Sequence, residues 1–218
     1  MKANNSQDRI PLSNVVEMVS KRYGIEKGNV ARTSMRIQLR EVCTQLNAIT
    51  ANEDIIRRKL LGTKVLDIGC GNGLDSEMTK GILPSHMVRK MEPWLCRALG
   101  TLGVQTTGID QYFPRYTSSK KDGLKPYNDP EWKFIQRDLQ QPDAIDTVTF
   151  PDNTFDLVNC RSFIGNTIPV LNDPRMQMLA RENAAAYEEL SSDIYNQAMR
   201  VLKPDGIFIW NLETYKKR

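Results

Sequence analysis

Long apolar runs are absent from this sequence. In 218 residues, no stretch approaches the ~20 consecutive apolar side chains that a membrane-spanning helix needs. The first residues, MKANNSQDRIPLS, are polar where a secretory leader carries an apolar segment. We therefore expect a cytoplasmic protein that has no membrane partner.

Cysteine and histidine are scarce and scattered. Cys43, Cys70, Cys96 and Cys160 lie far apart and form no Cys-x-x-Cys pair, and His86 is the single histidine. This spacing is typical of neither a zinc site nor a disulfide framework. We therefore expect no metal and interpret the cysteines as packed core residues, because free cysteine is among the most buried residue types.

The formal net charge is only +4, so neither sign of charge dominates the sequence. The excess of positive charge lies in the N-terminal part. Residues 1–61 hold 11 Lys and Arg against 6 Asp and Glu, whereas residues 62–218 hold 19 against 20. Apolar residues in 12–61 recur at helical spacing. We predict two or three helices and no strand in an N-terminal helical extension or lid, residues 1–61, followed by a second domain, residues 62–218.

From Lys64 onward, short apolar runs alternate with helical stretches, a pattern that predicts an α/β fold with a parallel sheet. The polar segment Gln111–Glu131, which carries three prolines, is predicted as a surface loop. The predicted strands are Lys64–Ile68, Gln105–Ile109, Lys133–Arg137, Phe155–Cys160 and Gly206–Asn211, and the predicted helices are Met87–Leu102 and Met178–Leu202.

Glycine gathers after the first predicted strand, in KVLDIGCGNGLDS. Glycine tolerates positive φ and has no Cβ, so such a loop brings bare backbone N–H groups against a ligand. The dinucleotide fingerprint GxGxxG is incomplete, because Leu74 stands at its third glycine. The phosphate-binding GxxxxGK[ST] motif is also absent, so a pyrophosphate site is disfavoured.

The spacing Asp67-x-Gly69-x-Gly71-x-Gly73 resembles motif I of the class I S-adenosylmethionine-dependent methyltransferases. LGVQTTGID, WKFIQRDLQQP, FPDNTFDLVNCRS and VLKPDGIFIW resemble that family's following segments, in the same order. The resemblance implies a Rossmann-like three-layer sandwich over 62–218, with a mainly parallel sheet of order 3-2-1-4-5. Strands 6 and 7 are expected to be absent, because the sequence ends at NLETYKKR. Either the sheet is truncated or a second copy or partner chain covers the edge of strand five.

The resemblance also implies which residues bind S-adenosylmethionine and its product S-adenosylhomocysteine. Asp110 would accept hydrogen bonds from both ribose hydroxyls, and Asp138 would receive the adenine amine, with the Leu139 N–H available to a ring nitrogen. The side chains of Cys70 and Asn72 have the alternative of facing solvent or a neighbouring strand. The full predicted set is Asp67, Gly69, Cys70, Gly71, Asn72, Gly73, Asp110, Gln111, Asp138, Leu139 and Asn159.

Catalytic residues are not fixed by this pattern, because methyl transfer from a sulfonium depends mainly on positioning and desolvation. Arg161, Ser162 and His86 are the candidates. Cys160 is not preceded by proline, as the nucleophile of cytosine C5 enzymes is, so we interpret it as a packed cysteine. By analogy with lids of small-molecule methyltransferases, the N-terminal helices would offer contacts from Tyr23, Arg32, Met35 and Arg36.

Three functions remain open at this point. The leading interpretation is an enzyme that methylates an oxygen or nitrogen of a small or medium-sized acceptor. An RNA methyltransferase that uses the basic N-terminal arm is the first alternative. A non-catalytic S-adenosylmethionine-binding subunit that needs a partner chain is the second.

Overall fold

The computed structural model describes residues 12–71, 92–110, 115–116, 125–126, 131–139, 141, 144–161, 184–210 and 213–218. The chain divides into two compact units, which are described separately below. Unit 1 comprises Met1–Thr63, Gly71–Thr106 and Phe113–Lys133, and unit 2 comprises Lys64–Cys70, Thr107–Tyr112 and Phe134–Arg218. In the described part of the chain, no helix combines the length and apolar character needed to cross a membrane.

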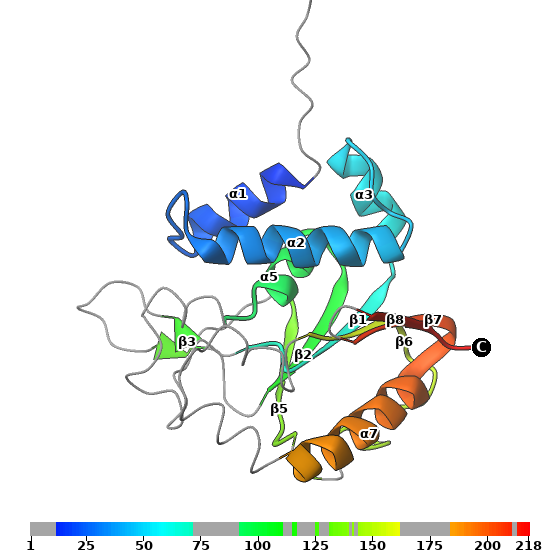
Figure 1. Ribbon diagram of the computed structural model, residues 1–218. Helices are drawn as coiled ribbons and strands as arrows, with labels where there is room; N and C mark the ends of the chain where they lie inside the picture. The colour runs from blue at the N-terminus through cyan, green and yellow to red at the C-terminus, as the bar shows by residue number, and fades with distance from the viewer. Residues whose placement is uncertain are drawn as a thin grey trace, which may run out of the picture. The chain divides into compact units, whose positions relative to one another are not determined.

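Unit 1 is mainly helical (Figure 1), with α1, α2 and α5 packed together. The described range 12–61 holds three helices and no strand, as predicted. Within the predicted loop Gln111–Glu131, the structure describes two short antiparallel strands, so that segment is not all loop. The elements are α1 Ser13–Arg22, α2 Val30–Gln45, α3 Glu53–Leu60, α5 Trp94–Thr101, β3 Arg115–Tyr116 and β4 Lys125–Pro126.

Side-chain caps mark where the helices of unit 1 begin. Asn29 Oδ1 accepts a hydrogen bond from the Ala31 N–H at 2.9 Å, and Asn52 caps α3 in the same way. The N-cap residue of α1 is Leu12, which has no capping side chain. Instead, the Glu53 carboxylate from α3 accepts from the backbone N–H groups of residues 14 and 15. The two helix starts are therefore tied together.

The six-stranded sheet has the order β5-β2-β1-β6-β7-β8, so its first five strands follow the predicted order 3-2-1-4-5. β1 pairs with β6 in parallel, β6 pairs with β7 in parallel, and β8 lies antiparallel to β7. The strands are β1 Lys64–Ile68, β2 Gln105–Asp110, β5 Lys133–Gln136, β6 Phe155–Cys160, β7 Leu202–Trp210 and β8 Glu213–Lys216.

β8 corrects the expectation that the sheet ends at its fifth strand. Its ladder with β7 runs from the pair Trp210–Glu213 to the pair Ile207–Lys216. The edge of β7 is therefore covered by this same chain, which removes the reason for expecting a second copy or partner chain there. β8 has no apolar signature, because an edge strand can be polar, and ETYK carries a single aromatic residue and no apolar run.

The segment Pro204–Gly206 also differs from the prediction. The predicted strand begins at Gly206, but β7 begins at Leu202, and Asp205 lies within it at φ 63°, in the left-handed region. The pairing of β7 with β6 shifts register between Phe155 and Leu157, opposite this irregularity. Aspartate tolerates the left-handed region better than most residues, which explains how the position accepts a side chain.

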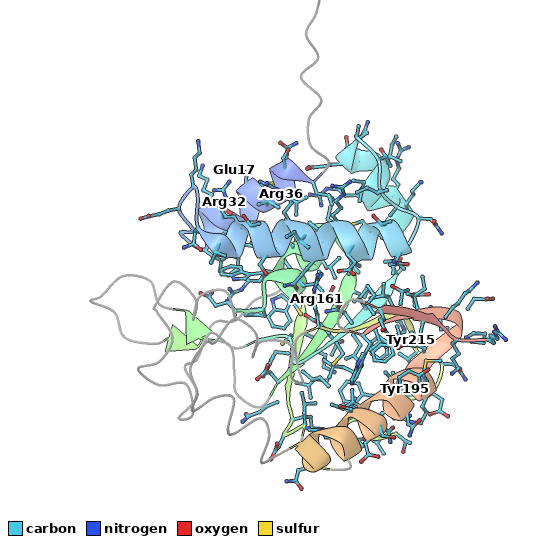
Figure 2. The ribbon with its side chains drawn as sticks, viewed as in Figure 1. Glu17, Arg32, Arg36, Arg161, Tyr195 and Tyr215 are labelled. Carbon is cyan, nitrogen blue, oxygen red and sulfur yellow. The ribbon has the colours of Figure 1, made fainter. Side chains whose placement is uncertain are left out.

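The core of unit 2 lies between the sheet and α7 (Ala184–Val201), as Figure 1 shows. Ile194, Ala198 and Val201 of α7 are buried together with apolar residues of the central strands. At the β8 end, Tyr195 of α7 meets Tyr215 of β8 edge to face, with ring centroids 5.4 Å apart (Figure 2). Aromatic packing therefore holds α7 against the last hairpin of the sheet.

Candidate functional site

Acidic and amide side chains gather where the central strands end. Asp67 and Asn159 are the next-to-last residues of β1 and β6 and are directly paired in the parallel register. Asp110 is the last residue of β2, and its carbonyl accepts from the Arg137 N–H at 2.9 Å. Asp138 follows Arg137. Four of the predicted cofactor residues therefore lie along one edge of the sheet, where ligands of open α/β sheets bind.

The glycines after β1 adopt the backbone that the motif requires. Gly69 has φ 66° and Gly71 has φ 91°, both in the left-handed region that favours glycine. However, the N–H groups of Gly69 and Cys70 donate to the Ile109 carbonyl at 2.9 and 3.1 Å. The expectation of bare amides is therefore wrong at these two positions. Their hydrogen bonds instead hold the start of the loop against β2.

Asp67 and Asn159 contact each other through their side chains. The Asn159 Nδ2 amide donates to Asp67 Oδ1 at 2.6 Å, and the two residues are only 3% and 4% exposed, respectively. Such a short distance is typical of a hydrogen bond to a charged acceptor. The structure thus brings these two predicted cofactor residues into contact with each other.

All four cysteines are buried free thiols. Burial, and secondarily the negative charge of Asp67, raise the pKa of the Cys160 thiol well above its usual value. Burial raises the pKa of Cys43 to about 12. Because the thiolate is the reactive form, a raised pKa disfavours a nucleophilic role for Cys160 and agrees with the prediction of a packed cysteine.

The side chains of Asp110 and Asp138 are half-buried, so they are neither sealed in the core nor fully solvated. Gln141 Nε2 lies 3.4 Å from Asp138 Oδ2, a weak contact at the far limit for a hydrogen bond. Leu139, by contrast, is 4% exposed and belongs to the apolar core of unit 2. Its side chain is therefore structural, and only its backbone remains a candidate for ligand contact.

Among the catalytic candidates, only Arg161 is described. It follows β6 directly and is half-buried (Figure 2). Ser162 and His86 lie outside the described residues, as do the predicted cofactor residues Asn72, Gly73 and Gln111.

The predicted lid contacts in unit 1 are mostly packing residues. Met35 is 0% exposed and Tyr23 1% exposed, so neither is presented to a substrate. Arg32 pairs with Glu17 of α1, as Figure 2 shows, and this pair lowers the pKa of the Glu17 carboxyl. Arg36 is half-buried on α2. The lid interpretation therefore loses two of its four contacts.

Sequence reasoning missed a buried ion pair in unit 1. Arg97 Nη1 lies 2.6 Å from Glu92 Oε2, and the two side chains are 0% and 2% exposed. The guanidinium carbon also lies 4.1 Å from the ring centroid of Tyr23 and 4.5 Å from that of Trp94. One signal was present in the sequence: Arg97 is the single charged residue of WLCRALGT, an otherwise apolar helix.

A surface hollow of about 350 Å³ lies in unit 1, formed by residues 12–14 and 51–54. None of the predicted cofactor residues lines it. In the described part of the chain, no group of three or more His, Cys, Asp or Glu is arranged to hold a metal ion.

No protein-family model matches this chain, and no curated protein matches it either. Among solved structures, two matches are crystal structures of the MycE methyltransferase of the mycinamycin biosynthetic pathway. The complex with Mg and SAH is 16% identical, covers 88% of this chain and 38% of that one, and has a TM-score of 0.38. The complex with Mg, SAH and mycinamycin VI is 15% identical, covers 88% and 36%, and has a TM-score of 0.39. This chain therefore spans less than two fifths of the length of that protein.

Proposed function

We propose that this protein is a methyltransferase that uses S-adenosylmethionine and methylates an oxygen or nitrogen of a small or medium-sized acceptor. One observation carries the proposal. Asp67, Asp110 and Asp138 lie at or just beyond the carboxyl ends of three neighbouring strands, close in sequence to or beside the loop whose glycines Gly69 and Gly71 have positive φ. This arrangement suits a nucleoside bound across the edge of an α/β sheet.

The residues present fit such a nucleoside. The half-buried carboxylate of Asp110 offers two acceptor oxygens, which suits the two vicinal hydroxyls of a ribose. Asp138 offers an acceptor for an exocyclic amine, two residues beyond β5. When bound, S-adenosylmethionine would supply a methyl group activated on a sulfonium sulfur. The task of the chain is then to position the reactants and exclude water, without a dedicated acid or base.

Calorimetric titration with S-adenosylhomocysteine tests the proposal. The wild-type protein should bind it, and Asp110→Ala should lose at least about 10-fold in affinity, because a hydrogen bond to a charged acceptor contributes about 1.5–3 kcal/mol. Asp193→Ala is the matched control, because it removes an exposed carboxylate from α7. A wild-type protein that binds no S-adenosylhomocysteine, or an Asp110→Ala variant with unchanged affinity and fold, would contradict the proposal.

A further inference from the structure

Asn159 is an unusual residue for its place in the sheet. β6 is a central strand with β1 on one side and β7 on the other, and its last four residues are all buried. Leu157, Val158 and Cys160 are apolar there, and Asn159 is the one amide among them. A buried amide without a partner is unfavourable, so its presence requires a partner in the same place. Asp67 is that partner, at 2.6 Å.

The chemistry of this pair is informative, because Asn159 is a neutral donor. A lysine or arginine would stabilise a buried carboxylate by cancelling its charge, whereas an amide holds the carboxylate without neutralising it. The charge of Asp67 is indeed felt by its neighbour Cys160, whose pKa it helps to raise. The contact therefore fixes the orientation of the Asp67 carboxylate at the end of β1, two residues before the first glycine of the loop.

We propose that Asn159 is a positioning residue, which fixes the carboxylate of Asp67 at the end of β1 and does not itself contact the nucleoside. This inference rests on the proposed function and refines it, because it changes the role that the sequence assigned to Asn159. Two observations support it. One N–H of the Asn159 amide donates to Asp67 Oδ1, and the two residues are directly paired in the ladder between β1 and β6.

Five variants test the role of Asn159, each measured by calorimetry with S-adenosylhomocysteine and by thermal unfolding: Asn159→Leu, Asp67→Asn, the two combined, an exchange variant and a control. Asn159→Leu keeps a similar volume and removes the donor. The exchange variant Asp67→Asn with Asn159→Asp rebuilds one amide–carboxylate hydrogen bond but moves the charge to β6. Val158→Ala, one residue away on the same strand, is the control for a general loss of packing at a buried position.

We expect Asn159→Leu and Asp67→Asn each to weaken binding by on the order of 10- to 100-fold, as loss of a hydrogen bond to a charged group predicts. Because the two residues act as one unit, Asp67→Asn with Asn159→Leu should bind no more weakly than the weaker single variant. The exchange variant should regain the melting temperature but not the affinity. Val158→Ala should lower the melting temperature with little change in affinity.

Several outcomes would overturn the inference. If Asn159→Leu binds S-adenosylhomocysteine with wild-type affinity, Asn159 has no role in binding. If the affinity losses of Asp67→Asn and Asn159→Leu multiply in the variant that combines them, Asn159 contacts the nucleoside itself. An exchange variant that regains full affinity would reduce the pair to a structural one. A wild-type protein that binds no S-adenosylhomocysteine would instead overturn the proposed function, and the inference with it.

Discussion

Removing the charge of Glu92 should destabilise unit 1 far more than an ordinary surface substitution. The Arg97 guanidinium is fully buried, and the Glu92 carboxylate is its ion-pair partner at 2.6 Å. Glu92→Gln keeps the shape of the side chain but leaves a buried cation without that countercharge. Breaking a buried pair by changing one partner costs about 3–5 kcal/mol. A typical domain has a free energy of unfolding of only about 5–15 kcal/mol, so a large part of the stability would be lost.

The double variant Glu92→Leu with Arg97→Met provides the decisive comparison. Methionine still fills the space beside the rings of Tyr23 and Trp94, and both charges of the Glu92–Arg97 pair are removed together. The double variant loses the cation–π contacts, which contribute about 1–2 kcal/mol when desolvated, and should be more stable than either single variant. The free energy of unfolding of Arg97→Lys should fall between those of the wild-type protein and Glu92→Gln, because lysine keeps the charge but not the planar stacking.

Urea denaturation followed by circular dichroism measures these free energies of unfolding. The reasoning predicts strong coupling, in which the loss in the double variant is smaller than the sum of the two single losses. If the free energy of unfolding of Glu92→Gln lies within about 1 kcal/mol of the wild-type value, the pair does not behave as a buried ion pair, which refutes the prediction.

Three further predictions concern unit 2 and the thiols. Lys217→Met should lower the free energy of unfolding by about 1–2 kcal/mol in urea denaturation, because Lys217 Nζ donates to the Leu202 carbonyl at 2.7 Å and to the Arg200 carbonyl at 3.2 Å. Asp205→Val should unfold at lower temperature than Asp205→Gly, since φ is 63° and a β-branched residue is strained there. Folding stability should fall as pH rises above about 9, because the unfolded Cys43 thiol ionises while the folded thiol, with a pKa of about 12, stays protonated. The expected slope is about 1.4 kcal/mol per pH unit, and Cys43→Ala should remove that part of the alkaline loss.

The sequence predicted the elements whose patterning is set by burial on both faces. β1 and β6 have the bounds that their apolar runs predicted, Lys64–Ile68 and Phe155–Cys160. β7 begins four residues earlier than predicted, at Leu202, because backbone pairing continues through the irregular segment around Asp205. β8 was missed for a related reason, because an edge strand is defined by its backbone ladder rather than by apolar side chains.

The candidate site could be predicted from the sequence only where the type of a residue determines its backbone conformation or its place at the end of a strand. Glycine at positions 69 and 71 could be assigned to a positive-φ turn, and both residues have positive φ. Which donors that turn leaves for a ligand could not be predicted, because the bonds from Gly69 and Cys70 to the Ile109 carbonyl depend on how β2 docks beside β1. The contact between Asp67 and Asn159 was hidden for the same reason, since 92 residues separate the partners in the chain.

Five of the nine basic side chains in the described range 12–61 are bonded within unit 1 itself, two of them to carboxylates. A phosphate backbone would have to compete with these internal bonds, so the net charge of the segment overstates the charge available to RNA. Of the other basic residues of this segment, Lys21, Lys27 and Arg40 are exposed, and Lys2 and Arg9 lie outside the described residues. The distribution of contacts therefore favours a small acceptor over RNA as the proposed substrate. The basic side chains bonded inside unit 1 are Arg22 to Glu131, Arg32 to Glu17, Arg57 to the Thr101 carbonyl, Arg58 to the Asp54 carbonyl and Lys59 to the Asn47 carbonyl.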